Sequence, residues 1–355
     1  MQRDTERKVQ LDSLRAFAIL PVLYTHFWKY NWLGTAGVFL FFMLSGYLIT
    51  GILLRSRGKP SALRNFYFRR ALRIAPIYYV TLTLSWLIDP RGIQESFPWH
   101  ALYLSNVWFT LKNGWSPWFT AHLWTLSVEE QFYLVWPLLI LMLPWRAIRP
   151  AIWCAILLGI SFQFGGAKFL GINILGAGIL TPAPLDKLGI GALLALAEAG
   201  LGFPRSLTNS GWAALAGVVM IEALPINRAS GWAPILRTEL LMLAFAALIA
   251  AASSGISGPA GAVLNCRAVR YIGRISYGIY LFHLFVYGAV AAIVGLIGLR
   301  PLEHGLATFV FLSALSIGVA ALSWHFFERP LNRLKERLSE DRVPLNVPVA
   351  PQTEH

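Results

Sequence analysis

Long apolar runs separated by short polar segments dominate the hydropathy pattern of this 355-residue chain. A helix needs about 20 mostly apolar residues to cross the hydrocarbon core of a bilayer. Ten runs approach that length, at residues 13–30, 36–54, 75–88, 123–144, 151–165, 183–200, 210–224, 238–253, 275–298 and 305–327. The predicted fold class is therefore all-α, a polytopic membrane helix bundle of about ten transmembrane helices.

The segment 89–122 separates two predicted spans and is not itself expected to cross the membrane. Its apolar stretch, residues 99–111, is too short and too interrupted by polar positions. Tryptophan is enriched at membrane–water interfaces, and four tryptophans lie here: Trp99, Trp108, Trp115 and Trp118. We predict an interfacial or re-entrant loop.

The composition excludes most other classes of protein. Hydrophobic residues make up 56% of the chain and charged residues only 13%, whereas soluble domains carry about 25% charged residues. The two cysteines are too few for a disulfide framework or a thiolate metal site, and we expect no metal. The net charge of +13 does not indicate nucleic-acid binding, because the basic residues lie between apolar runs rather than along one soluble face.

The distribution of basic residues predicts the orientation. With the N-terminus in the cytoplasm, 22 of the 30 Lys and Arg residues fall on the cytoplasmic side of the predicted spans. Cytoplasmic loops carry such an excess, so we expect a multi-pass protein of the cytoplasmic (inner) membrane with both termini cytoplasmic. The mixed-charge start lacks a signal-peptide cleavage site, and the first apolar run is expected to be the first span.

Two regions follow from this pattern. Residues 1–330 form the predicted integral-membrane domain, and residues 331–355 a basic, Pro-rich cytoplasmic tail whose end is expected to be disordered. We expect no soluble domain after the last span, so the function should reside within or beside the bilayer.

Ionisable residues inside predicted spans are costly and mark candidate functional positions. Arg15 and His26 are 11 residues apart, which places them on one helix face, about 16 Å apart along the axis. Alternatively, Arg15 extends to the headgroups and His26 is an interfacial histidine. The fourth span opens with adjacent carboxylates, Glu129 and Glu130, of which only one can face a given partner. A carboxylate beside an imidazole would orient it, although both could instead meet headgroup water.

A cluster of arginines precedes the third span. Arg70 and Arg73 are three residues apart and can share a helix face with Arg69 nearby. Guanidinium groups bind phosphate bidentately, but cytoplasmic loops are rich in arginine in any case. In the ninth span, Ser276 and Tyr280 begin a polar stripe that continues to His283. Ser276 could equally cap the helix.

The order of these motifs resembles acyltransferase family three, multi-pass bacterial membrane proteins that mostly O-acetylate cell-surface glycans. The arginine and histidine of the first span, with ten residues between them, resemble the family's opening signature. Further resemblances lie at residues 37–49, 68–76, 123–133, 276–280 and 327–330. Two positions depart from the family pattern: Phe39 stands where an acid is common, and no arginine precedes Asp186.

The resemblance implies an enzyme, an O-acetyltransferase that moves an acetyl or other acyl group from cytoplasmic acetyl-CoA to a glycan or glycolipid hydroxyl. The bilayer and these two substrates are the implied partners. The implied catalytic residues are His26, as general base, with Glu129 and Glu130. Acetyl-CoA would be held by a second set of residues: Arg15, Arg69, Arg70, Arg73, Ser276 and Tyr280.

Two other functions fit parts of the pattern. A transporter or flippase for a glycolipid could use His26 and the two glutamates as a proton relay. It would not need a cytoplasmic CoA site, and no inverted repeat is evident in the sequence. An inactive sensor on the same scaffold is the third reading, against which the presence of the histidine and arginine motifs counts.

Overall fold

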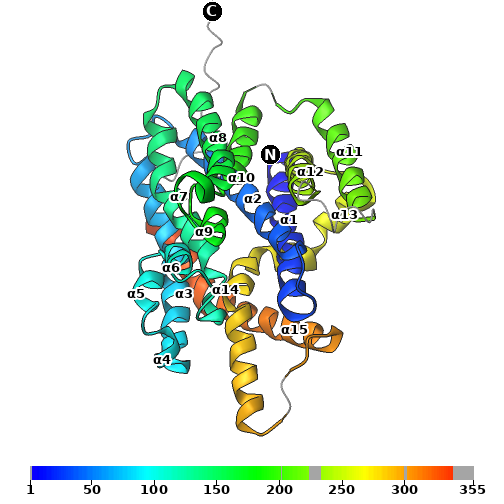
Figure 1. The fold of residues 1–355 in the computed structure, drawn as a ribbon. Helices are drawn as coiled ribbons and strands as arrows, with labels where there is room; N and C mark the ends of the chain where they lie inside the picture. The colour runs from blue at the N-terminus through cyan, green and yellow to red at the C-terminus, as the bar shows by residue number, and fades with distance from the viewer. Residues whose placement is uncertain (1, 201, 224–232, 300–301, 339–355) are drawn as a thin grey trace, which may run out of the picture.

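The described part of the chain in this computed structural model is helical and contains no strand. It covers residues 2–200, 202–223, 233–299 and 302–338. Figure 1 shows the helices as a bundle in which α1 and α2 run side by side and α11 stands at the periphery.

Ten long helices form the bundle in the residues that the structure describes. They are α1 (Gln2–Phe27), α2 (Leu33–Ser56), α3 (Ala62–Ile88), α7 (Leu123–Met142), α8 (Trp145–Phe169), α10 (Leu185–Ala199), α11 (Arg205–Ala223), α12 (Ala233–Ser254), α14 (Arg267–Leu296) and α15 (Leu306–Ser323). Short elements connect them: α4 (Pro90–Ile93), α5 (Phe97–Ala101), α6 (Ser105–Lys112), η1 (Trp118–Thr120), α9 (Ile174–Ile179) and α13 (Gly258–Asn265). A π-helical turn, η3 (Trp324–Glu328), joins α15 to α16 (Arg329–Leu338).

Each of the ten predicted spans overlaps one of the ten long helices. Five stretches of the described chain are also long and apolar enough to cross a membrane by length and hydropathy alone: α2, α8, α12, α14 and residues 306–333, which begin with α15. Polar side chains lower the hydropathy of others. Helix α3, for example, begins at Ala62 rather than near residue 75, so the arginine cluster lies inside the helix and not in the preceding connection.

The segment 89–122 forms only short helices. Its longest helix, α6, has eight residues, far fewer than a membrane crossing needs. Figure 1 places α4, α5 and α6 together toward the lower end of the bundle. The structure therefore agrees with the prediction that this segment does not span.

Two sets of contacts define opposite ends of the bundle. Arg57, after α2, donates hydrogen bonds to the carbonyls of Ile140 and Leu143 at the end of α7. The α2–α3 and α7–α8 connections are thus neighbours. Lys112 pairs with Glu95 at 2.9 Å within the 89–122 segment. The charge distribution predicts that these two ends face opposite sides of the membrane.

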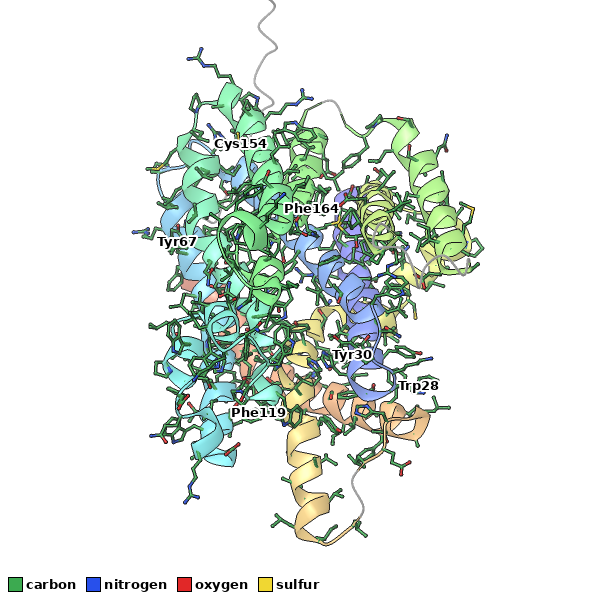
Figure 2. All side chains as sticks on the ribbon, viewed as in Figure 1. Trp28, Tyr30, Tyr67, Phe119, Cys154 and Phe164 are labelled. Atoms are coloured by element: carbon green, nitrogen blue, oxygen red, sulfur yellow. The ribbon has the colours of Figure 1, made fainter. Side chains whose placement is uncertain are left out.

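Apolar side chains cover much of the outer surface. Phe164 on α8 is 57% exposed, and Leu134 on α7 is 65% exposed. In Figure 2, Trp28, Tyr30 and Phe119 lie toward the lower end and Cys154 toward the upper end. Such an exterior suits a protein surrounded by lipid rather than by water. The end of the predicted tail, residues 339–355, lies outside the described residues.

Helices α2 and α10 pack at backbone distance. A Cβ atom added at Gly46 would lie 2.0 Å from the carbonyl oxygen of Leu188, and one added at Gly191 would lie 2.0 Å from that of Met43. Small residues allow this approach between membrane helices. The contact fixes the part of α2 that carries Ser45.

Candidate active site

Five long helices line a cavity that is partly open to its surroundings. Helices α1, α2, α3, α7 and α14 each contribute to its wall. The lining includes apolar side chains from α2, such as Phe41 and Phe42, and hydroxyl groups from three helices. The lining residues are Arg15, Val38, Phe41, Phe42, Ser45, Arg70, Arg73, Ile74, Thr125, Leu126, Glu129, Ser276, Tyr277 and Tyr280.

The lining is positively charged. Three arginines, Arg15, Arg70 and Arg73, face one carboxylate, that of Glu129. Arg15 comes from α1, and Arg70 and Arg73 come from α3. The fold thus brings Arg15 into the same cavity as two arginines that are at least 55 positions later in the chain. Guanidinium groups are suited to phosphate and carboxylate ligands. The cavity can therefore hold an anion, with apolar wall available for an uncharged part of the same ligand.

The two adjacent carboxylates have different surroundings. Glu129 lines the cavity and accepts a hydrogen bond from the hydroxyl of Ser45 on α2. Glu130 lies 4.0 Å from Arg70, whose guanidinium also stacks on the Tyr133 ring at 3.7 Å from its centroid. Residues one apart on a helix point in different directions, and the structure separates these two as predicted.

Three histidines form a second group beside the cavity. His26 at the end of α1 and His283 on α14 have ring centroids 5.0 Å apart. His122, immediately before α7, lies 4.9 Å from His283 by the same measure. His283 is fully buried and His122 is 3% exposed, whereas His26 is only partly buried. We call these three residues the histidine cluster.

Tyr280 separates the cavity from the histidine cluster. Its ring lines the cavity and lies 5.6 Å from the His122 ring and 5.5 Å from the His283 ring. Its hydroxyl donates to the His122 carbonyl at 3.2 Å and accepts from the Thr125 hydroxyl at 2.8 Å. The side chain thus joins α14 to the start of α7 and is shared by both groups.

The predicted site residues divide between these two groups. Arg15, Arg70, Arg73, Glu129, Ser276 and Tyr280 line the cavity, and His26 belongs to the histidine cluster. The shared helix face predicted for Arg15 and His26 suits this arrangement, because one helix supplies both groups. Arg69 is absent from the cavity lining, and Glu130 contacts Arg70 behind it. Within the described residues, no hydrogen bond or ion pair joins His26 to either glutamate.

Several lining residues were not singled out from the sequence. Ser45, Thr125 and Tyr277 lie inside motifs that resemble the family, but their own roles depend on neighbours in other helices. His122 was one polar residue among several at the start of a span. Its contact with His283 joins positions 161 residues apart and leaves no periodic signal in the sequence.

A buried ion pair lies where the sequence departs from the family pattern. Asp186 is 5% exposed and Lys187 is 2% exposed. The lysine ammonium lies 2.7 Å from Oδ2 of Asp186 and 2.9 Å from Oε1 of Gln163 on α8. It also lies 4.7 Å from the Phe39 ring centroid. A cation thus accompanies Asp186, supplied by the residue after it.

No group of three or more His, Cys, Asp or Glu side chains in the described residues is arranged to hold a metal ion. This applies to the histidine cluster as well. The chemistry that the described side chains offer here is anion binding, hydrogen bonding and proton transfer.

Fold and site together define a helical membrane protein with an arginine-lined internal cavity beside a histidine cluster. Comparison with known proteins gives the family: residues 8–325 match the family described as an acyltransferase domain, and the chain belongs to it. This confirms the resemblance of the sequence motifs.

Curated relatives align with most of the chain. The "Putative peptidoglycan O-acetyltransferase YrhL" of Bacillus subtilis is 30% identical over 94% of this chain and 56% of its own length. The peptidoglycan O-acetyltransferase OatA of Listeria monocytogenes is 30% identical over 91% of this chain and 55% of its own length. The chain therefore spans little more than half the length of these relatives. No solved structure matches.

Proposed function

We propose that this protein is a membrane O-acetyltransferase that moves an acetyl group from cytoplasmic acetyl-CoA to a hydroxyl of a cell-surface or exported glycan. The observation that carries the proposal is the placement of Arg15, Arg70 and Arg73 in one cavity that adjoins the histidine cluster. Membership of the acyltransferase family and the names of the relatives support the same reaction.

The arginine-lined cavity is the proposed donor site. Acetyl-CoA carries phosphates at one end and a thioester at the end of a flexible arm. Arg15, Arg70 and Arg73 would bind the phosphates through charge-assisted hydrogen bonds. The apolar wall that Phe41 and Phe42 form suits the uncharged arm. The donor would enter from the end at which the α2–α3 connection lies, which the charge distribution assigns to the cytoplasm.

His26 is the proposed general base. Arg15 and His26 are separated by about 16 Å along α1, a distance that an extended thioester arm can cover. The imidazole would take the proton of the acceptor hydroxyl as the oxygen attacks the acetyl carbonyl. The same proton would then pass to the departing thiolate. The partial exposure of His26 leaves it accessible to an acceptor at the outer side.

The carboxylate of Glu129 has a positioning role in this proposal. It lines the donor cavity and is held by Ser45, so it would orient polar groups of the donor rather than the His26 ring. Glu130 would act through Arg70, by holding the guanidinium against Tyr133.

The experiment is acetyl transfer in a defined membrane. The protein is reconstituted in vesicles, labelled acetyl-CoA is supplied on one side and glycan fragments on the other. The proposal predicts label on the glycan only when acetyl-CoA is at the face of the α2–α3 connection. Movement of an unacetylated glycolipid across the membrane, with no label transferred, would instead support a transporter.

A further inference from the structure

Two members of the histidine cluster are locked by backbone carbonyls. Nδ1 of His283 lies 2.6 Å from the carbonyl oxygen of Tyr280, and Nε2 of His122 lies 3.0 Å from that of Leu281. A carbonyl oxygen can only accept, so each of these nitrogens carries the hydrogen. In its neutral form, His283 is therefore protonated at Nδ1 and His122 at Nε2.

The opposite nitrogens have no partner. Nε2 of His283 and Nδ1 of His122 are buried and make no hydrogen bond. In the neutral rings both are bare lone pairs, and a buried acceptor without a donor is destabilising. The nearby Tyr280 hydroxyl cannot supply a donor, because its hydrogen goes to the His122 carbonyl.

His283 is the middle ring of the cluster. Its centroid is 5.0 Å from that of His26 and 4.9 Å from that of His122. An imidazole nitrogen lies on the rim of its ring, so rings at this separation can bring one nitrogen of each within hydrogen-bond distance. No hydrogen bond joins the two rings in this structure, so a rotation of the His26 ring is needed for it to offer an N–H to the bare nitrogen of His283.

We propose that His283 is a positioning residue that accepts a hydrogen bond from His26 through its bare Nε2, an inference that rests on the proposed function. With one nitrogen of His26 donating to His283, the other nitrogen presents its lone pair to the acceptor hydroxyl. Catalytic bases are commonly oriented by a third group, and His283 would orient His26 in this way.

The proton balance of the step is simple. The hydroxyl O–H bond breaks and its proton goes to His26, while the oxygen forms a bond to the acetyl carbon and the carbon–sulfur bond breaks. The His26 imidazolium keeps its hydrogen bond to His283 and then gives the transferred proton to the CoA thiolate. His283 neither gains nor loses a proton overall.

Two amide substitutions separate this role from simple packing. In His283→Gln the amide oxygen can take the place of Nε2 as an acceptor, whereas in His283→Asn the amide nitrogen can keep the hydrogen bond to the Tyr280 carbonyl. We expect both to lower kcat more than they raise KM for acetyl-CoA. His283→Gln should retain about 10- to 150-fold more activity than His283→Asn, the range of one charge-assisted hydrogen bond.

The experiment measures glycan O-acetylation by the full-length protein, with equal amounts of His283→Gln, His283→Asn and His283→Ala in the membrane. Higher activity of the Asn variant than of the Gln variant would overturn the proposal, because the bond to Tyr280 would then be what matters. Equal losses in all three would overturn it too. A wild-type protein without transferase activity would contradict the proposed function itself, as would an unimpaired His26→Ala variant.

A double substitution gives a second readout. A residue that acts through His26 should add little further loss once His26 is replaced, whereas an independent structural role should add its full effect. We expect His26→Ala with His283→Asn to have nearly the activity of His26→Ala alone. A further loss equal to that of the single His283→Asn change would contradict the proposal.

Discussion

Among the three arginines of the cavity, the surroundings of Arg70 and Arg73 differ. Arg70 is held against the Tyr133 ring and lies 4.0 Å from Glu130. Arg73 makes no ion pair within 4.0 Å in the described part of the chain. Its guanidinium is therefore the more available to a bound anion, and Arg70 is in part committed to the protein.

This difference predicts the effect of Arg73→Ala. The change should raise KM for acetyl-CoA more than it lowers kcat, because it removes a contact made equally in the ground state and the transition state. One charge-assisted contact corresponds to about 1.5–3 kcal/mol, or roughly 10- to 150-fold. Lysine at this position should restore only part of the loss, since it lacks the planar fork.

The matched control is Arg146→Ala. Arg146 is exposed and lies in the first turn of α8, on the same predicted side of the membrane, and it does not line the cavity. We expect unchanged acetyl-CoA binding there. Binding that is equally weakened by both changes would show that general surface charge, rather than the cavity, attracts the donor.

Helices α2 and α10 act as one unit because glycine lets their backbones meet. The consequence for the site is direct: α2 carries Ser45, whose hydroxyl holds Glu129, and the aromatic wall of the cavity. A shift of α2 would move all of these together. The packing of two helices outside the catalytic groups thus contributes to the geometry of the donor site.

The substitution Gly191→Ala tests this dependence. Its Cβ would lie 2.0 Å from the carbonyl oxygen of Met43, so the two backbones must separate. Overpacking of this kind costs about 1–3 kcal/mol, and we expect a lower unfolding temperature in detergent together with a raised KM for acetyl-CoA.

Gly295→Ala is the comparison, because no atom lies within 4 Å of the added Cβ and the residue is within α14. Alanine favours a helix over glycine by about 1 kcal/mol, so stability should be unchanged or slightly higher. Equal destabilisation by the two changes would argue against close packing as the cause.

At the scale of the whole molecule, the distribution of basic residues predicts two membrane sides of different charge. Lys59 lies in the α2–α3 connection, which the hydrogen bonds of Arg57 join to the end of α7, and Arg146 lies in the first turn of α8. Lys112 ends α6 in the 89–122 segment. Donor and acceptor of the proposed reaction would approach from these two sides. The orientation in the membrane therefore decides which substrate reaches which side of the site.

Reporter fusions test this orientation. We expect a cytoplasmic signal for fusions at Lys59 and Arg146 and an external signal at Lys112, as the excess of basic residues predicts. The relative signals of the three fusions in intact cells are the measurement. A cytoplasmic signal at Lys112 would contradict the interpretation of residues 89–122 as an outer segment.

Much of the architecture could be predicted from the sequence, because bilayer thickness imposes a length on each apolar run. Less of the candidate site could be predicted from the sequence. Arg15 and His26 share one helix, so spacing alone relates them. The contacts of His26 with His283 and of His122 with His283 depend on how α1, α7 and α14 pack, which helix periodicity does not encode. Likewise, hydropathy placed the start of α3 too late, since the arginines within it resemble a polar connection.

In the proposed reaction the cavity binds the donor and His26 performs the transfer, and the decisive variant is His26→Ala. General-base catalysis typically contributes 10²- to 10⁴-fold. We therefore predict at least such a loss of glycan O-acetylation in cells that contain equal amounts of each variant, with acetyl-CoA binding retained. His325→Ala, an exposed histidine after α15, is the control and should remain active. Near-normal acetylation by His26→Ala would show that His26 is not the general base.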